Sequence, residues 1–431
     1  MANQPDSLEA PVKNHGWRVT FAGTGINLAL GVLYSWSIIS GGIDKGGWGW
    51  TQFQRALPYS VACLVFSLVM VPAGRMQDRI GPRLVATVGG ILVGAGMILS
   101  GIIGNSVPGY IIGFGILAGA GIGFGYASAT PPAVKWFPAA KTGLIAGLVV
   151  SGFGLASVYI APLSNWLISV TSVGTTTLIL GIGFLVVVTG LAQMLEPPPD
   201  GYVPAGTPAP QDAANNRRKE NFTPREVLGT WQFYTLWFMY AAGAGAGLMV
   251  ISIAKSLAKA AKSEAETIGV IAVATLAIGN GAGRIIAGVL SDKIGRKATL
   301  VIFFVLQAIM VLLVATLGTS AGFVYALPLI TALVGANYGA NLALFPSVTK
   351  DYYGLKNFGV NYGLVFTAWG VGGFVLAQLA GYVKDVTGSF NFAYYTSIVL
   401  LILAGIATFI VKMPHHTVEA IPEPVGAGAE A

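Results

Sequence analysis

The sequence predicts an all-α membrane protein with twelve transmembrane helices, arranged as two similar bundles of six. Three observations support this fold class: composition, recurring apolar stretches and a loop motif that occurs twice. Of the 431 residues, 54% are hydrophobic and only 10% are charged, and the mean hydropathy is +0.72. Soluble domains carry about 25% charged residues. So few charges cannot cover a water-exposed surface of this size, and we expect the lipid bilayer to surround most of the chain.

Apolar windows of about 19 residues place the twelve helices. The first six lie near 17–40, 52–74, 83–103, 108–131, 142–167 and 173–195, and the second six near 231–255, 266–290, 298–317, 322–347, 358–383 and 390–412. We expect Pro58, Pro131 and Pro132 to bend or end their helices. The predicted organisation is an N-terminal tail, a first bundle, a polar linker, a second bundle and a C-terminal tail, at 1–16, 17–195, 196–230, 231–412 and 413–431.

The distribution of basic residues predicts the orientation. With both termini inside, 17 of the 24 Lys and Arg residues fall in cytoplasmic segments, six fall outside and Arg284 lies within a helix. This asymmetry matches the positive-inside rule. We therefore expect a multi-pass protein of the inner membrane with both termini in the cytoplasm.

The sequence lacks the residues that several classes of function require. The net charge of +7 comes from basic residues in short loops, so we predict no nucleic-acid partner. A single Cys63 excludes a disulfide framework and a Cys-ligated metal cluster. No Gly-x-x-x-x-Gly-Lys-[Ser/Thr] phosphate loop occurs, and no nucleophile–base arrangement is evident. The prediction is a protein that is not an enzyme and uses no cofactor or metal.

A motif of ten residues occurs once in each predicted half. Both Gly74–Arg83 and Gly288–Lys297 fit Gly-x-x-x-Asp-[Arg/Lys]-x-Gly-x-[Arg/Lys] in the equivalent cytoplasmic connection, which predicts an internal repeat. The motif resembles the signature loop of the major facilitator superfamily, whose two halves are related by a pseudo-twofold axis. That resemblance implies that the motif gates the cytoplasmic side, through Asp78, Arg79, Arg83, Asp292, Lys293 and Arg296. The alternative is that the motif only turns the chain and sets topology.

Arg284 is the one basic residue well inside a predicted helix. It lies eight residues before Asp292, about 12 Å along a helix axis. A charge at that depth normally faces a cavity or the bundle interior. All acidic residues fall in predicted loops, termini or helix ends, so a bound carboxylate is the economical counter-charge for the guanidinium. The alternative is an arginine whose donors are satisfied by backbone groups.

Asn280 precedes Arg284 by one helical turn on the same face. It could orient the guanidinium or contact the ligand directly. The alternative reading is a hydrogen bond between helices.

Segments across nearly the whole chain resemble the oxalate:formate antiporter family of that superfamily. They include Gly31–Trp36, Gly119–Tyr126, Lys135–Pro138, Asn280–Arg284 and Ala343–Ser347. In that family an aromatic cage surrounds the anion and an arginine on the eighth helix holds its carboxylate. Carried over by position, the resemblance implies a lining of Tyr34, Tyr126, Phe153, Tyr338, Phe366 and Arg284. The alternative for any single ring is ordinary packing.

One position departs from that family. Its oxalate carrier has a second cation, a lysine on the eleventh helix, and the matching residue here is Trp369. A dianion would bring a second negative charge without a partner, so the departure favours a monoanion such as lactate, pyruvate or formate. The chain is also similar to bacterial relatives of the monocarboxylate transporters, which share the asparagine–arginine pair.

The resemblance implies a secondary transporter for a small organic carboxylate, working by alternating access as a monomer in the lipid bilayer. Proton co-transport is left open, because Asn280 and an uncharged first helix offer no titratable residue for it. Exchange of carboxylates, including a dicarboxylate, is the nearest alternative. A transporter-like membrane receptor for an organic anion is the alternative from another class.

Overall fold

A computed structural model describes residues 14–199, 201–205, 221–259, 265–317 and 323–414. Most of the two predicted tails and the middle of the predicted linker lie outside the described residues. The basic cluster Arg217 to Lys219 lies there too.

The described residues form twelve long helical spans, which confirms the predicted fold class. Eleven of these spans are long and apolar enough to cross a membrane, and α12 is a further helix of 30 residues. The elements of the first half are α1 (Gly16–Leu30), η1 (Gly31–Ser35), α2 (Trp36–Lys45), α3 (Gln52–Ile80), α4 (Pro82–Ile103), α5 (Val107–Tyr110), η2 (Ile111–Ala118), α6 (Gly119–Lys135), η3 (Ala139–Lys141), α7 (Thr142–Val170) and α8 (Val173–Ala192). Those of the second half are α10 (Pro224–Leu228), α11 (Trp231–Lys259), α12 (Ala265–Ile294), α13 (Arg296–Leu317), α14 (Phe323–Tyr353), α15 (Phe358–Thr387) and α16 (Asn391–Ile410).

Several helices differ in detail from the sequence-based expectation. The helices α3 and α12 continue through most of the polar motif and end at Ile80 and Ile294. Gly81 and Gly295 then turn the chain with φ of 89° and 90°, a backbone conformation that favours glycine. The motif is therefore a helix end followed by a one-residue turn. Pro58, Pro131 and Pro132 lie inside α3 and α6, which do not end at them.

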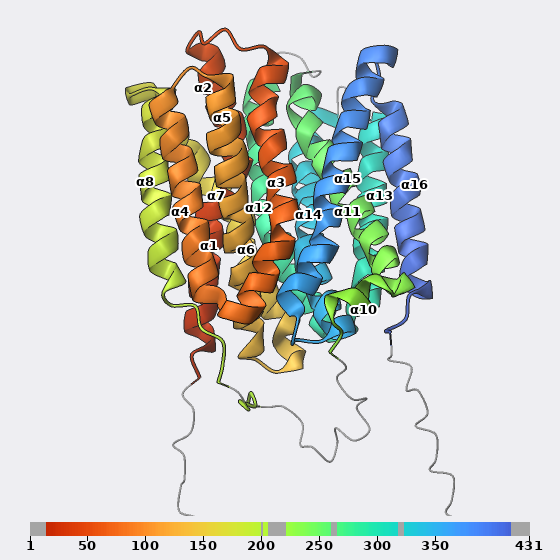
Figure 1. The fold of residues 1–431 in the computed structure, drawn as a ribbon. Coiled ribbons are helices and arrows are strands. Elements are labelled where there is room, and N and C mark those ends of the chain that lie inside the picture. The colour runs from red at the N-terminus through yellow and green to blue at the C-terminus, as the bar shows by residue number, and fades with distance from the viewer. Residues whose placement is uncertain (1–13, 200, 206–220, 260–264, 318–322, 415–431) are drawn as a thin grey trace, which may run out of the picture.

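The helices form two groups of six spans. Figure 1 shows α1 to α8, coloured red to yellow-green, on one side and α11 to α16, coloured green to blue, on the other. Two pairs carry most of the contact between the groups: α7 packs against α12, and α3 packs against α15. We call the end of the bundle that holds Asp78, Asp292 and the connection 354–357 the motif end. It is the end that the charge distribution predicts to be cytoplasmic.

Candidate functional site

Arg284 lies at the middle of α12, where glycines let neighbouring helices approach closely. On one side, a Cβ at Gly154 of α7 would lie 3.0 Å from the Arg284 Nε atom. On the other side, a Cβ at Gly339 of α14 would lie 2.1 Å from the Asn280 carbonyl oxygen. The arginine is fully buried, with 0% of its surface exposed. The chain therefore holds a guanidinium group where the two halves meet.

The guanidinium of Arg284 is only partly satisfied by the protein. Its Nε donates to the Asn280 Oδ1 atom at 3.1 Å, and its Nη1 donates to the Val150 carbonyl oxygen of α7. Its Nη2 is buried and has no hydrogen-bond partner in the part of the chain that the structure describes. No carboxylate pairs with Arg284 among the described residues. The site thus has a positive charge and a free donor that suit an anion.

The predicted aromatic residues gather around Arg284. The 3₁₀ segment η1 interrupts the first span and packs against α7, so that Tyr34 lies edge-on to Phe153 with ring centroids 5.1 Å apart. The Arg284 Cζ atom lies 5.9 Å from the centroid of the Phe153 ring. Tyr126 packs against both Phe153 and Phe366, at 5.4 Å in each case. These four rings, which come from both halves, therefore form one connected cluster beside the cation.

Tyr338 joins the two halves at this level. Its hydroxyl lies 2.5 Å from the Tyr34 hydroxyl, and it accepts a hydrogen bond from the Trp369 indole nitrogen at 2.8 Å. Trp369 also stacks on Phe366, with centroids 5.3 Å apart. The indole N–H is thereby directed at a protein hydroxyl. The structure brings together all eight predicted binding residues in one buried cluster.

Phe66 belongs to the same cluster, although the sequence did not single it out. This buried α3 ring contacts Tyr126, Phe153, Phe366 and Trp369, at centroid distances of 5.4, 5.9, 5.1 and 5.4 Å. A phenylalanine within an apolar helix carries no signal that separates a site residue from a packing residue. Only the fold reveals its position.

Asp78 joins the halves at the motif end. Its two carboxylate oxygens accept hydrogen bonds from the backbone N–H groups of Gly359 and Val360, at 3.1 and 3.0 Å. These amides open α15, where a negative charge also complements the helix dipole. We call this the Asp78 contact.

Asp292 makes the equivalent contact with the first half. It accepts from the N–H groups of Gly143 and Leu144, at 3.0 and 2.8 Å, where α7 begins. Arg296 donates to Asp292 at 2.6 Å and to Asp351 at 2.9 Å. Asp351 was not among the predicted residues. We call this the Asp292 contact; the first half has Pro82 where the second has Arg296, so only one of the two contacts includes a guanidinium.

The other predicted gating residues lie outside these contacts. Arg79 and Lys293 are exposed, and no ion pair or hydrogen bond of either is present among the described residues. Arg83 lies 3.9 Å from Glu196, within its own half. The hydrogen bonds between the halves at the motif end therefore come from the two aspartates of the motif and from Lys350, which donates to the Thr142 hydroxyl at 2.6 Å. Arg296 bonds Asp292 from within the same half.

Comparison with known proteins agrees with this architecture. The family model of the Major Facilitator Superfamily matches residues 19–261 and 236–428. The chain is 27% identical over 384 residues to the oxalate:formate antiporter of Oxalobacter formigenes, covering 88% of each chain. It is 25% identical to monocarboxylate transporter 11 of Mus musculus, covering 90% of this chain and 86% of the relative. An uncharacterized MFS-type transporter of Escherichia coli, YhjX, is 29% identical and covers 82% of this chain.

Solved structures show the same fold at low sequence identity. The proton:xylose symporter XylE superposes with a TM-score of 0.70 at 14% identity, covering 92% of this chain and 96% of its own. The transporter FucP, in an outward conformation, gives 0.67 at 16% identity, covering 91% and 98%. The duplicated motif, the twelve helices and the family match over nearly the whole chain agree. The chain belongs to the Major Facilitator Superfamily.

Proposed function

We propose that this protein moves a small monocarboxylate, such as lactate, pyruvate or formate, across the inner membrane by alternating access, with the anion bound at Arg284. One observation carries the proposal: a fully buried guanidinium whose Nη2 has no partner among the described residues. An unpaired buried charge is costly. A carboxylate that accepts from Nη2 and lies within the aromatic cluster removes that cost when it binds.

The relatives support a carboxylate as the ligand. Their names describe an oxalate:formate antiporter and monocarboxylate transporters. The cluster chemistry agrees with those names, because tyrosine hydroxyls can donate to carboxylate oxygens while the rings exclude water. In this proposal Tyr34, which is partly buried and hydrogen-bonded to Tyr338, contacts the ligand together with Arg284.

The surroundings of Trp369 favour a single negative charge. Its indole donates to Tyr338 and stacks on Phe366, so it offers the site neither a cation nor a free donor. A second carboxylate would be desolvated there without a partner. Arg284, the one fully buried cation among the described residues, therefore suits a monoanion better than oxalate.

Alternating access accounts for the contacts between the halves. The proposed moving units are the bundles 17–195 and 231–412, with the linker 196–230 between them. The Asp78 and Asp292 contacts then close the motif end, which we propose is cytoplasmic. Opening that end requires both aspartates to leave the first turns of α15 and α7.

Uptake into proteoliposomes tests the proposal. We expect accumulation of labelled lactate, pyruvate or formate by the wild type and none by Arg284→Gln. Arg75→Gln is the matched control, because Arg75 is exposed on α3 and makes no ion pair with any described residue. Uptake by Arg284→Gln at the wild-type rate would make Arg284 structural.

The same vesicles distinguish the coupling modes. Uptake that rises with an inward proton gradient indicates symport. Counterflow that needs internal carboxylate and ignores the gradient indicates exchange. Oxalate carried as well as lactate would contradict the preference for a monoanion.

A further inference from the structure

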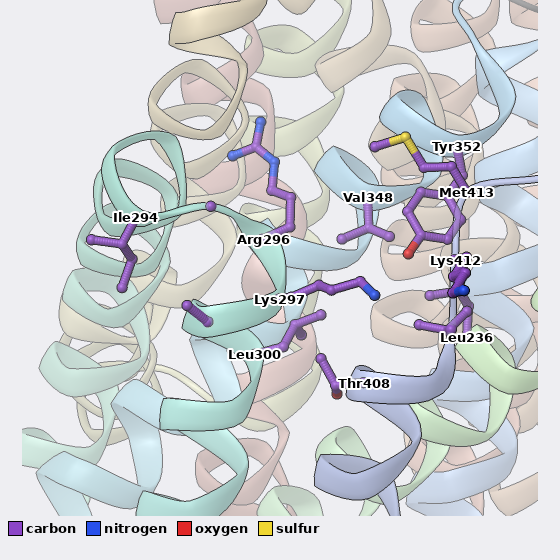
Figure 2. Close-up of a pocket in the computed structure, with 13 residues that line it drawn as sticks. Leu236, Ile294, Arg296, Lys297, Leu300, Val348, Tyr352, Thr408, Lys412 and Met413 are labelled. Atoms are coloured by element: carbon purple, nitrogen blue, oxygen red, sulfur yellow. The ribbon is translucent and has the colours of Figure 1, made fainter.

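A cavity that is distant from Arg284 in its lining lies within the second half at the motif end. It has a volume of about 700 Å³ and lies between the ends of α11, α13, α14 and α16. Most of its lining is apolar, including Leu236, Leu300, Val348 and Val411. Figure 2 shows Lys297 extending across this cavity, with Tyr352 and Lys412 on the far side. We call it the lysine cavity.

The two lysines that line this cavity have no counter-charge in the part of the chain that the structure describes. Neither Lys297 nor Lys412 makes an ion pair or hydrogen bond within the described ranges. Arg296 also lines the cavity, but its guanidinium is bonded to Asp292 and Asp351 and so adds no net positive charge. Lys297 and Lys412, both exposed, therefore line an apolar cavity with no paired anion among the described residues.

In the first half, the positive charge at the equivalent motif position is paired with a carboxylate. Arg83 holds the same position in the motif as Lys297. There, the segment after α8 supplies Glu196, which pairs with Arg83 at 3.9 Å and also contacts Arg18 and His15. In the second half, the segment after α16 supplies Lys412 instead. In the first half, the basic residue at this motif position is paired with Glu196. In the second half, no described carboxylate pairs with Lys297.

We propose that the lysine cavity binds the phosphate group of an anionic phospholipid, with part of an acyl chain against the apolar lining. Paired lysines suit a phosphate, and apolar walls suit a hydrocarbon chain rather than a free ion. Basic pockets between transmembrane helices on the cytoplasmic side bind anionic headgroups in this way. The volume falls within the range of small-molecule pockets. The proposal does not depend on the transported substrate.

Lipid binding to the purified full chain tests this site. The probes are phosphatidylglycerol, phosphatidylcholine and glycerol 1-phosphate, with bound lipid counted by native mass spectrometry. Each lysine near a headgroup is expected to contribute about fivefold in affinity, so both together contribute about 25-fold. We expect Lys297→Gln/Lys412→Gln to lower the preference for phosphatidylglycerol over phosphatidylcholine by about that factor. Each single variant should lower it by about fivefold, which keeps the test open if the double variant does not fold.

The matched control removes the same charge elsewhere at the motif end. Lys141 and Lys356 are exposed and outside the cavity, so Lys141→Gln/Lys356→Gln should leave the lipid preference within about twofold. An equal loss in both double variants would overturn the site, since it would show a general charge effect. Binding of glycerol 1-phosphate as tight as phosphatidylglycerol would assign the cavity to a free phosphate and overturn the lipid.

The chain's own C-terminal segment is the remaining occupant to test. Residues 415–431 contain Glu419, Glu423 and Glu430 and lie outside the described residues. A variant ending at Pro414 should bind phosphatidylglycerol as the full chain does. A rise of tenfold or more on truncation would show that these carboxylates fill the cavity, and would overturn the proposal.

Discussion

Replacing Asp78 by asparagine should weaken the contact between α3 and α15 by a predictable amount. The carboxylate accepts two backbone N–H bonds, at 3.1 and 3.0 Å, where α15 begins. Hydrogen bonds to a charged group contribute about 1.5–3 kcal/mol each, against about 0.5–1.5 for neutral ones. An asparagine keeps one acceptor oxygen and turns an NH₂ group towards the second amide. The dipole contribution of about 0.3–1 kcal/mol is lost as well.

With the lower value for each charged bond, as suits a carboxylate that is only partly buried, the loss is about 2–3 kcal/mol from any state that keeps this contact, and none from states that lack it. The ratio of closed to open molecules at this contact should therefore fall by about 30- to 150-fold. The comparison is simpler than at Asp292, because the first half has Pro82 where the second has Arg296, and Lys135 is the basic neighbour of Asp78. Asp78 is thus the cleaner of the two motif aspartates to test.

A single cysteine at Val360 reports this opening. Val360 is 4% exposed at the start of α15, and Cys63 is the one native cysteine. In a Cys63→Ala background, Val360→Cys should react with a maleimide about 30-fold faster, or more, when Asp78→Asn is added. Arg75→Gln, at an exposed residue of the same helix, should not change the rate. A change of less than threefold with Asp78→Asn would refute the assignment of Asp78 to inter-half closure.

Two further changes test the packing and the charge selectivity. Gly288→Ala would place a Cβ 2.2 Å from the Gly143 carbonyl oxygen, so α7 and α12 must separate and uptake should fall; Gly183→Ala, where a Cβ meets nothing within 4 Å, is the control. Normal uptake by the Gly288 variant would contradict the need for this close approach. Trp369→Lys supplies a second cation and should raise the uptake ratio of oxalate to lactate by about tenfold or more. A rise of the same size in the oxalate-to-lactate ratio of Trp369→Phe would show that ring size, and not charge, sets the preference.

Composition and apolar periodicity predicted the helices because the bilayer imposes a length and a polarity on each span. The positions of the helix ends at the motif were predicted less accurately. A hydropathy window ends where polar residues begin, yet α3 and α12 continue as helices through Asp78 and Asp292. Once outside an apolar environment, a helix is limited by caps and turns, here Gly81 and Gly295. The sequence indicated that the motif glycines permit a tight turn, but it did not show that one glycine ends each helix.

Some residues of the candidate site could be identified from the sequence, and others could be identified only from the fold. Arg284 could be singled out because a charge in a long apolar segment is costly, and its position at the α7–α12 contact follows from the fold. The resemblance to a family supplied the rings at Tyr34 and Phe153, whose composition alone does not distinguish them from packing residues. Phe66 had no such signal. The partners of Arg284 and Asp78 at Val150 and Gly359 are backbone atoms, which no pattern of side chains can identify.

The helix pair α7–α12 offers a physical connection between the anion and the motif end. Arg284 donates to the Val150 carbonyl of α7, and Asp292, two turns further along α12, accepts from the first amides of α7. Under the proposed function, a carboxylate at the free Nη2 that also engages Nη1, as in a bidentate pair, competes with the Val150 carbonyl for Nη1. Binding then replaces a bond between the halves by a bond to the ligand, while the Asp292 contact is unchanged. The free energy holding α7 to α12 falls only when the anion is present, so the protein's opening at the motif end becomes dependent on its cargo.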